Sequence, residues 1–124
     1  AVKTVFDSKL KIQMVGLEST EEIPLTKELR FHWASLRKYP ALDLIGQGYS
    51  LVLADEADST YYLWDVLTTL SSLYPDLVTK TQETAKVETA GRAAGRTFKD
   101  PAGRPLTLVT SADKEAFFKT MDLE

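Results

Sequence analysis

The chain has 124 residues, with 15 basic and 18 acidic side chains, one histidine and no cysteine. A chain of this length forms one domain, which needs neither disulfides nor a structural metal to be stable. The absence of cysteine excludes thiol nucleophiles, redox dithiols and thiolate metal sites. No stretch approaches the roughly 20 apolar residues of a membrane helix. We therefore expect a soluble, cytoplasmic protein without a membrane partner.

The first predicted element is a half-buried strand over 4–15. Leu10, Ile12 and Met14 alternate there with polar residues, and such alternation is typical of a strand with one buried face. Gly16 marks the predicted end of the strand.

A helix is predicted over 25–39, because apolar side chains recur there every three or four residues. Thr26 is its predicted N-cap. Leu29, Phe31 and Trp33 also fit a period of two, so a strand remains an alternative for this segment.

Pro40 is expected to end that helix, and the glycines of 46–48 indicate a turn. The apolar run over 49–54 then predicts a buried strand.

The clearest helical pattern covers 63–77, where apolar residues recur at helical spacing. Asp58 or Ser59 is the predicted cap of this helix, which thus includes Tyr61 and Tyr62, and Pro75 closes it near its C-terminus. The alternative is a hairpin in which 61–66 pairs with 51–55.

The segment 79–97 is expected to be exposed and flexible, because Val87 is its one large aliphatic residue. A turn over 100–103 then predicts a hairpin within 98–110. A last helix follows, with Ser111 as its predicted cap and an apolar face that carries Phe117, Phe118 and Met121.

This order of elements predicts an α+β fold. We expect a single small domain over 1–124, in which one mixed or antiparallel sheet packs against two or three helices.

An acidic loop over 55–58 follows the predicted strand. The stretch 50–58 resembles the strand-plus-acid motif of nucleotide hydrolases, but the chain has no G-x-x-x-x-G-K-[ST] phosphate loop. Carboxylates are ligands for magnesium and calcium. Asp55, Glu56 and Asp58 are therefore candidate metal ligands, and Asp55, which also resembles the phosphoacceptor of receiver domains, is a candidate phosphoacceptor. Alternatively, these acids only complement the positive end of the next helix.

Basic residues concentrate in 86–104, which holds five of them against two acidic residues. A basic segment on an acidic chain can contact an acidic partner or a phosphate backbone. Its candidate binding residues are Arg92, Arg96, Lys99 and Arg104.

Tyr61, Tyr62 and Trp64 are the candidate aromatic anchor of a binding face, since Tyr and Trp dominate interface hot spots. On the predicted helix, the two tyrosines would point about 100° apart, so at least one would reach the surface.

Catalysis needs positioned acid, base or nucleophilic groups, and His32 stands alone in this sequence without a partner at motif spacing. We therefore expect no enzyme activity and no cofactor, but a non-catalytic accessory or assembly module of bacterial or phage type. Its expected partner is another protein or a second copy of itself. The alternatives are nucleic-acid binding through 86–104 and a metal or phosphoacceptor site at 55–58.

Overall fold

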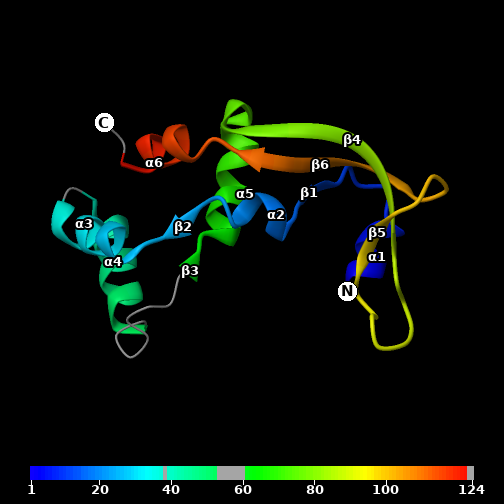
Figure 1. Cartoon of the computed structure of the whole chain (residues 1–124), viewed down its shortest axis with the longest axis horizontal. Coiled ribbons are helices and arrows are strands. Elements are labelled where there is room, and N and C mark those ends of the chain that lie inside the picture. The colour runs from blue at the N-terminus through cyan, green and yellow to red at the C-terminus, as the bar shows by residue number, and fades with distance from the viewer. Residues whose placement is uncertain (38, 53–60, 123–124) are drawn as a thin grey trace.

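A computed structural model describes residues 1–37, 39–52 and 61–122. Helices α3 and α4 lie at one end of the molecule, and a bent sheet extends from α5 toward the other end (Figure 1). The elements in chain order are α1 (Val2–Phe6), β1 (Gln13–Val15), α2 (Leu17–Thr20), β2 (Pro24–Leu25), α3 (Lys27–Leu36), α4 (Pro40–Val52), β3 (Tyr61–Tyr62), α5 (Trp64–Leu73), a 3-10 turn (Pro75–Leu77), β4 (Val78–Val87), β5 (Thr97–Lys99), β6 (Arg104–Ala112) and α6 (Lys114–Asp122).

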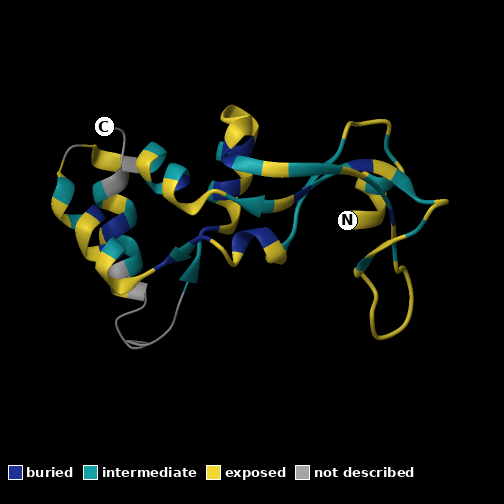
Figure 2. Cartoon of the chain, turned by 45° about the horizontal axis from the view of Figure 1, so that its top comes forward, coloured by how far each residue is buried: buried dark blue, intermediate teal, exposed yellow. Residues whose placement is uncertain are grey.

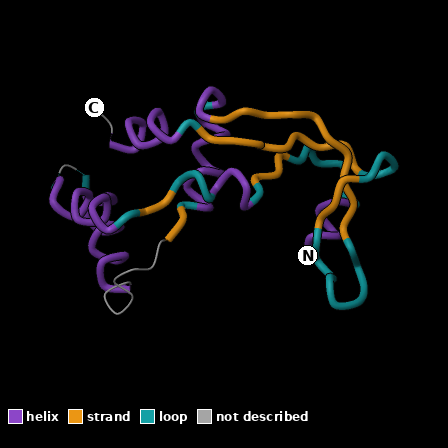
Figure 3. Tube along the Cα trace, in the orientation of Figure 1, coloured by secondary structure: helices purple, strands orange, loops and turns teal. Residues whose placement is uncertain are grey.

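The main sheet has four strands in the order β1-β6-β4-β5, and β2 pairs with β3 in a separate two-stranded ribbon. β1 runs parallel to β6, whereas β4 is antiparallel to both β5 and β6. The tube in Figure 3 shows β4 and β6 as the two long strands that span half of the molecule. The predicted α+β class with a mixed sheet packed against helices is confirmed, with more helices than the two or three expected.

The segment expected to be exposed over 79–97 contains most of β4, the longest strand. Its threonines favour a strand, and pairing with β6 from Val78 to Ala85 and with β5 from Ala85 to Val87 compensates for the lack of large apolar side chains. Only 88–96, which lies between β4 and β5, is exposed at every residue.

The turn predicted over 100–103 forms, but the hairpin predicted within 98–110 is wrong, because β5 and β6 each pair with β4 and not with each other. Ala85 of β4 pairs with Lys99 on one side and with Arg104 on the other, so the turn carries the chain across β4. A Cβ atom on Gly103 would lie 2.5 Å from the backbone carbonyl of Ala85. Glycine is therefore required at this crossing, because two backbones meet there.

The hydrophobic core lies where α3, α5 and α6 meet the β2–β3 ribbon. Figure 2 shows buried residues in these elements, whereas the loop after β4 is exposed throughout. The fully or almost fully buried members are Ile23, Leu25, Trp33, Leu63, Leu67 and Phe117. Phe118 and Met121 pack against this cluster, so the predicted apolar face of the last helix is confirmed.

The helix predicted over 25–39 is confirmed as α3, and the Thr26 side chain accepts a hydrogen bond from the Leu29 N–H at 3.3 Å. The cap of α6 is Asp113, whose carboxylate accepts a hydrogen bond from the Ala116 N–H at 2.9 Å, and is not Ser111. The helix predicted over 63–77 forms as α5 and a 3-10 turn that begins at Pro75.

Two strand predictions are wrong. The strand expected over 4–15 forms only at its end, as β1, because α1 occupies the start of the segment. The strand expected over 49–54 and the turn over 46–48 lie within α4 as far as Val52. Pro40 begins this helix, since proline is well suited to the first helical position.

Gly46 is a site of close helix packing. A Cβ atom there would lie 2.5 Å from the backbone nitrogen of Ala34 in α3, so the glycine lets the two helices approach. Gly48 in the same helix has no such neighbour within 4 Å.

We predict opposite effects for alanine at these two positions. Gly46→Ala should destabilise the fold by about 1–3 kcal/mol, because the methyl group overlaps the backbone of α3. Gly48→Ala should stabilise it by about 0.5–1 kcal/mol, because alanine has the higher helix propensity. Urea denaturation of both variants tests this pair, and equal effects would show that α3 and α4 do not pack through Gly46.

An ion pair also joins β4 to the turn over 100–103 that crosses it. Lys86 Nζ lies 2.9 Å from Asp100 Oδ2, and the Ala102 N–H donates to Asp100 Oδ1 at 2.7 Å. The hydrogen bond from Lys86 is the main reason why the pKa of Asp100 lies below its usual range, and the Ala102 N–H adds to the effect.

This shift predicts a pH dependence. Because the pKa of Asp100 is lower in the folded state than in the unfolded state, the ion pair with Lys86 stabilises the fold fully at pH values above the ordinary pKa of aspartate. This stabilisation is lost as the pH falls through the pKa that Asp100 has in the folded protein. Lys86→Met should therefore raise the pKa of Asp100 toward its ordinary value, as measured by carboxyl ¹³C NMR titration. Lys99→Met, which removes the ion pair of Lys99 with Glu83, is the matched control. If the pKa of Asp100 does not rise in Lys86→Met, the interaction does not form in solution.

Candidate functional site

Four aromatic side chains from three elements meet beside the core, and we name them the aromatic cluster: Tyr49 of α4, Tyr61 and Tyr62 of β3, and Trp64 of α5. The ring centroids lie 4.8 Å apart for Tyr49 and Tyr61, 5.0 Å for Tyr61 and Trp64, and 6.5 Å for Tyr62 and Trp64. These are favourable separations for tilted aromatic pairs.

Backbone pairing brings these rings together. Tyr61 lies opposite Leu25 and Tyr62 opposite Pro24 in the β2–β3 ribbon, and the N–H of Leu63 donates to the carbonyl of Ile23 at 3.2 Å. Tyr61 and Tyr62 therefore lie on a strand and not on the helix that the sequence predicted. Neighbouring side chains on a strand point to opposite faces.

Both tyrosines of β3 are half-buried, and Trp64 is 41% exposed. The candidate anchor residues are thus partly accessible. Tyr61 also packs against the core, together with Tyr49.

A polar network accompanies the rings. Burial is the main cause that raises the pKa of Tyr49 to about 12, and a side-chain hydrogen bond with Tyr61 and the negative charge of Asp65 add to it. Asp65 lies in the first turn of α5 and is exposed. The aromatic cluster therefore lies beside a carboxylate. Aromatic faces stack on planar heterocycles, and a neighbouring carboxylate can stabilise positive charge or accept hydrogen bonds.

The candidate basic residues lie elsewhere. They occupy the β4–β5 end of the sheet, away from β3 (Figure 1). Lys99 pairs with Glu83 at 2.7 Å, and Arg104 donates to the Leu10 carbonyl at 2.6 Å. Arg92 and Arg96 are exposed in the loop between β4 and β5. The structure thus does not bring the basic and aromatic candidates into one site.

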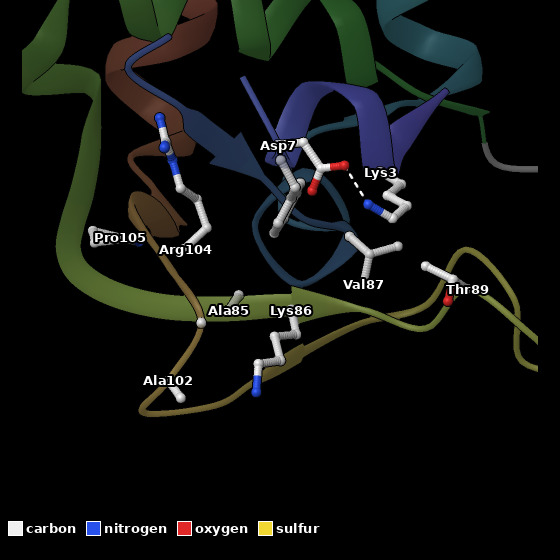
Figure 4. A pocket seen from close by; sticks show the side chains of 11 residues that line it. Lys3, Asp7, Ala85, Lys86, Val87, Thr89, Ala102, Arg104 and Pro105 are labelled. Carbon is white, nitrogen blue, oxygen red and sulfur yellow. Dashed lines mark hydrogen bonds and ion pairs between the residues drawn. The ribbon is translucent and has the colours of Figure 1, made fainter. Parts of the chain in front are cut away.

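A groove of about 390 Å³ lies between α1 and the crossing over β4 (Figure 4). Its lining includes three cations, and each already has a partner. Lys3 pairs with Asp7, as the dashed line in Figure 4 marks, Lys86 pairs with Asp100, and Arg104 binds a backbone carbonyl. The groove therefore has no geometry that favours an anionic ligand.

The candidate metal ligands Asp55, Glu56 and Asp58 lie outside the described residues. Within the described ranges, no group of three histidine, cysteine or carboxylate side chains is arranged to hold a metal ion. No helix of the described chain is long and apolar enough to span a bilayer.

Solved structures similar to this chain are nucleoside hydrolases. The inosine-uridine preferring nucleoside hydrolase from Bacillus anthracis is 36% identical with a TM-score of 0.83, over 98% of this chain and 38% of that chain. An inosine-guanosine nucleoside hydrolase is 22% identical with a TM-score of 0.77, over 94% of this chain and 40% of that one. A purine-preferring ribonucleoside hydrolase from Gardnerella vaginalis is 22% identical with a TM-score of 0.69, over 93% of this chain and 39% of that one.

The chain thus spans about two fifths of the length of these structures. No family model and no curated protein matches the chain.

These similarities contradict the expectation of a non-catalytic accessory, assembly or protein-binding module, because the similar proteins are enzymes. The expectation overvalued the missing cysteine and the single histidine. Hydrolysis of a bond to a sugar carbon typically relies on carboxylates and water. A sequence without cysteine and with one histidine can still supply the carboxylates. Asp65, the carboxylate next to the aromatic residues that the sequence singled out, was not among the predicted site residues. The chain is similar in sequence and fold to about two fifths of a nucleoside hydrolase.

Proposed function

We propose that this chain is part of a nucleoside hydrolase, a protein that uses water to cleave the bond between the base and the ribose of a ribonucleoside. The observation that carries the proposal is the 36% identity to the Bacillus anthracis enzyme over 98% of this chain. Inosine and uridine, which name the preference of that enzyme, are the proposed substrates.

The aromatic cluster is the proposed contact surface for the base. Its rings form an unbroken series from Tyr49 through Tyr61 to Trp64 and Tyr62. The exposed part of Trp64 offers a face on which a planar base can stack. Such stacking contributes about 1–3 kcal/mol per base and tolerates both purines and pyrimidines, because every base has a π-face.

Asp65 is the proposed electrostatic partner of the ribose. Cleavage at a sugar carbon passes through a transition state with positive charge on the sugar ring. A carboxylate fixed at the start of α5 stabilises that charge if the ribose lies next to the stacked base. The position of Asp65 directly after Trp64 supports this arrangement.

We predict that the chain can replace its counterpart in a known enzyme. The test is a chimera of the Bacillus anthracis enzyme in which the region similar to this chain is exchanged for these 124 residues. The chimera should release hypoxanthine from inosine and uracil from uridine, as measured by chromatography. Trp64→Ala in the chimera should lower kcat/KM by about 5- to 150-fold, which corresponds to about 1–3 kcal/mol of stacking.

Tyr74→Ala is the control, because Tyr74 follows the opposite end of α5 and is 48% exposed. It should change kcat/KM by less than about twofold. A chimera that melts cooperatively but releases base from neither nucleoside would contradict the proposed function. The cytoplasmic location expected from the sequence stays a prediction.

A further inference from the structure

A second groove, of about 830 Å³, runs over one face of the main sheet, and we name it the sheet groove. Its lining includes the apolar side chains of Met14 in β1, Leu17 in α2, Phe98 in β5, and Leu106, Leu108 and Val109 in β6, of which Leu106 and Val109 are buried. Met14 lies opposite Leu108 in the parallel pair, so the two side chains lie on one face of the sheet.

The other face of the sheet meets α5. Gln13 Nε2 donates to the Ser71 hydroxyl at 2.9 Å, and Lys80 Nζ donates to the Ser71 carbonyl at 3.1 Å. Gln13 precedes Met14 in β1, and successive side chains of a strand point to opposite faces. The sheet groove therefore lies on the face away from α5.

The pairing of β1 indicates what kind of surface this is. β1 is an edge strand of the main sheet and runs parallel to β6. The outer edge of β1 has no strand partner among the described residues, and such an open edge is a template for pairing with further backbone. Among the described helices, only α2 contributes to the lining of the groove, through Leu17 and Glu18. Leu17 is 61% exposed.

Polar residues surround the apolar floor. Glu83 and Lys99 form an ion pair of 2.7 Å in the lining, where Glu18 and Arg96 are also found. An apolar centre within a polar rim is the usual anatomy of a protein–protein interface.

We propose that the sheet groove is the surface on which the remaining part of a nucleoside hydrolase fold packs. The occupant is a polypeptide equivalent to the part of the Bacillus anthracis enzyme that this chain does not match, and it adds backbone along the open edge of β1 and side chains over Met14 and Leu108. Two observations carry this inference: the chain accounts for 38% of that enzyme, and β1 has an open edge beside the sheet groove. The inference rests on the proposed function.

Methionine oxidation tests the proposal without any substitution. The chain has two methionines, Met14 in the sheet groove and Met121, which packs against the core. The chain is treated with dilute hydrogen peroxide, alone and after mixing with the unmatched part of the Bacillus anthracis enzyme made as a separate polypeptide. Mass spectrometry should show that sulfoxide formation at Met14 slows at least about fivefold on mixing, whereas the rate at Met121 stays unchanged.

A pair of variants locates the contact. Leu108→Glu places a charge on the floor of the groove and should abolish the protection of Met14. Leu44→Glu is the matched control, because Leu44 is 74% exposed on α4 and lies outside the groove. Circular dichroism confirms that each variant is folded, and if Leu108→Glu unfolds, the oxidation of the unsubstituted chain decides the matter.

Two outcomes would overturn this inference, and a third would distinguish it from the proposed function. Equal oxidation of Met14 with and without the added polypeptide overturns this inference. Protection of Met14 that rises with the concentration of the chain alone also overturns it, because a second copy then covers the groove. Protection of Met14 by the added polypeptide, combined with an inactive but folded chimera, contradicts the proposed function and supports the interface.

Discussion

The pairing of β6 is the interaction on which the rest of the structure depends. On one side β6 pairs antiparallel with β4 along nearly its whole length, and on the other side it pairs in parallel with β1. These two ladders fix the position of α6, which follows β6 directly and brings Phe117 into the core. They also fix the face of the sheet that meets α5, and thereby the position of Trp64 at the start of that helix.

The sequence predicted those elements whose signal is local. The apolar spacing and Thr26 cap of α3 and the turn before β6 are set by neighbouring residues, and they form where expected. The wrong predictions concern elements whose structure depends on contacts with residues far away in the sequence. Gly46 lies inside a helix and not in a turn, and the backbone of Ala34 in α3 lies so close to it that only glycine fits there. The polar strand β4 forms because β6 pairs with it, a partner about 25 residues further along the chain.

The candidate site was predictable only in part. The sequence singled out Tyr61, Tyr62 and Trp64, but nothing in the spacing showed that Tyr49, from the segment misassigned as a strand, would join them through α4. The adjacent Asp65 went unnoticed because a single carboxylate in a helix is common. The enzyme class was not predicted, because the similarity that indicates it is an identity of 36% spread over 98% of the chain.

The bond from Arg104 to the carbonyl of Leu10 joins residues 94 positions apart, and β1 likewise pairs with residues near 107–109. On the ribosome, Leu10 emerges 94 residues before its partner Arg104. Because synthesis runs from the N-terminus to the C-terminus, β1 lacks its strand partner until β6 has left the exit tunnel, and the nascent chain is meanwhile exposed to chaperones and to mispairing.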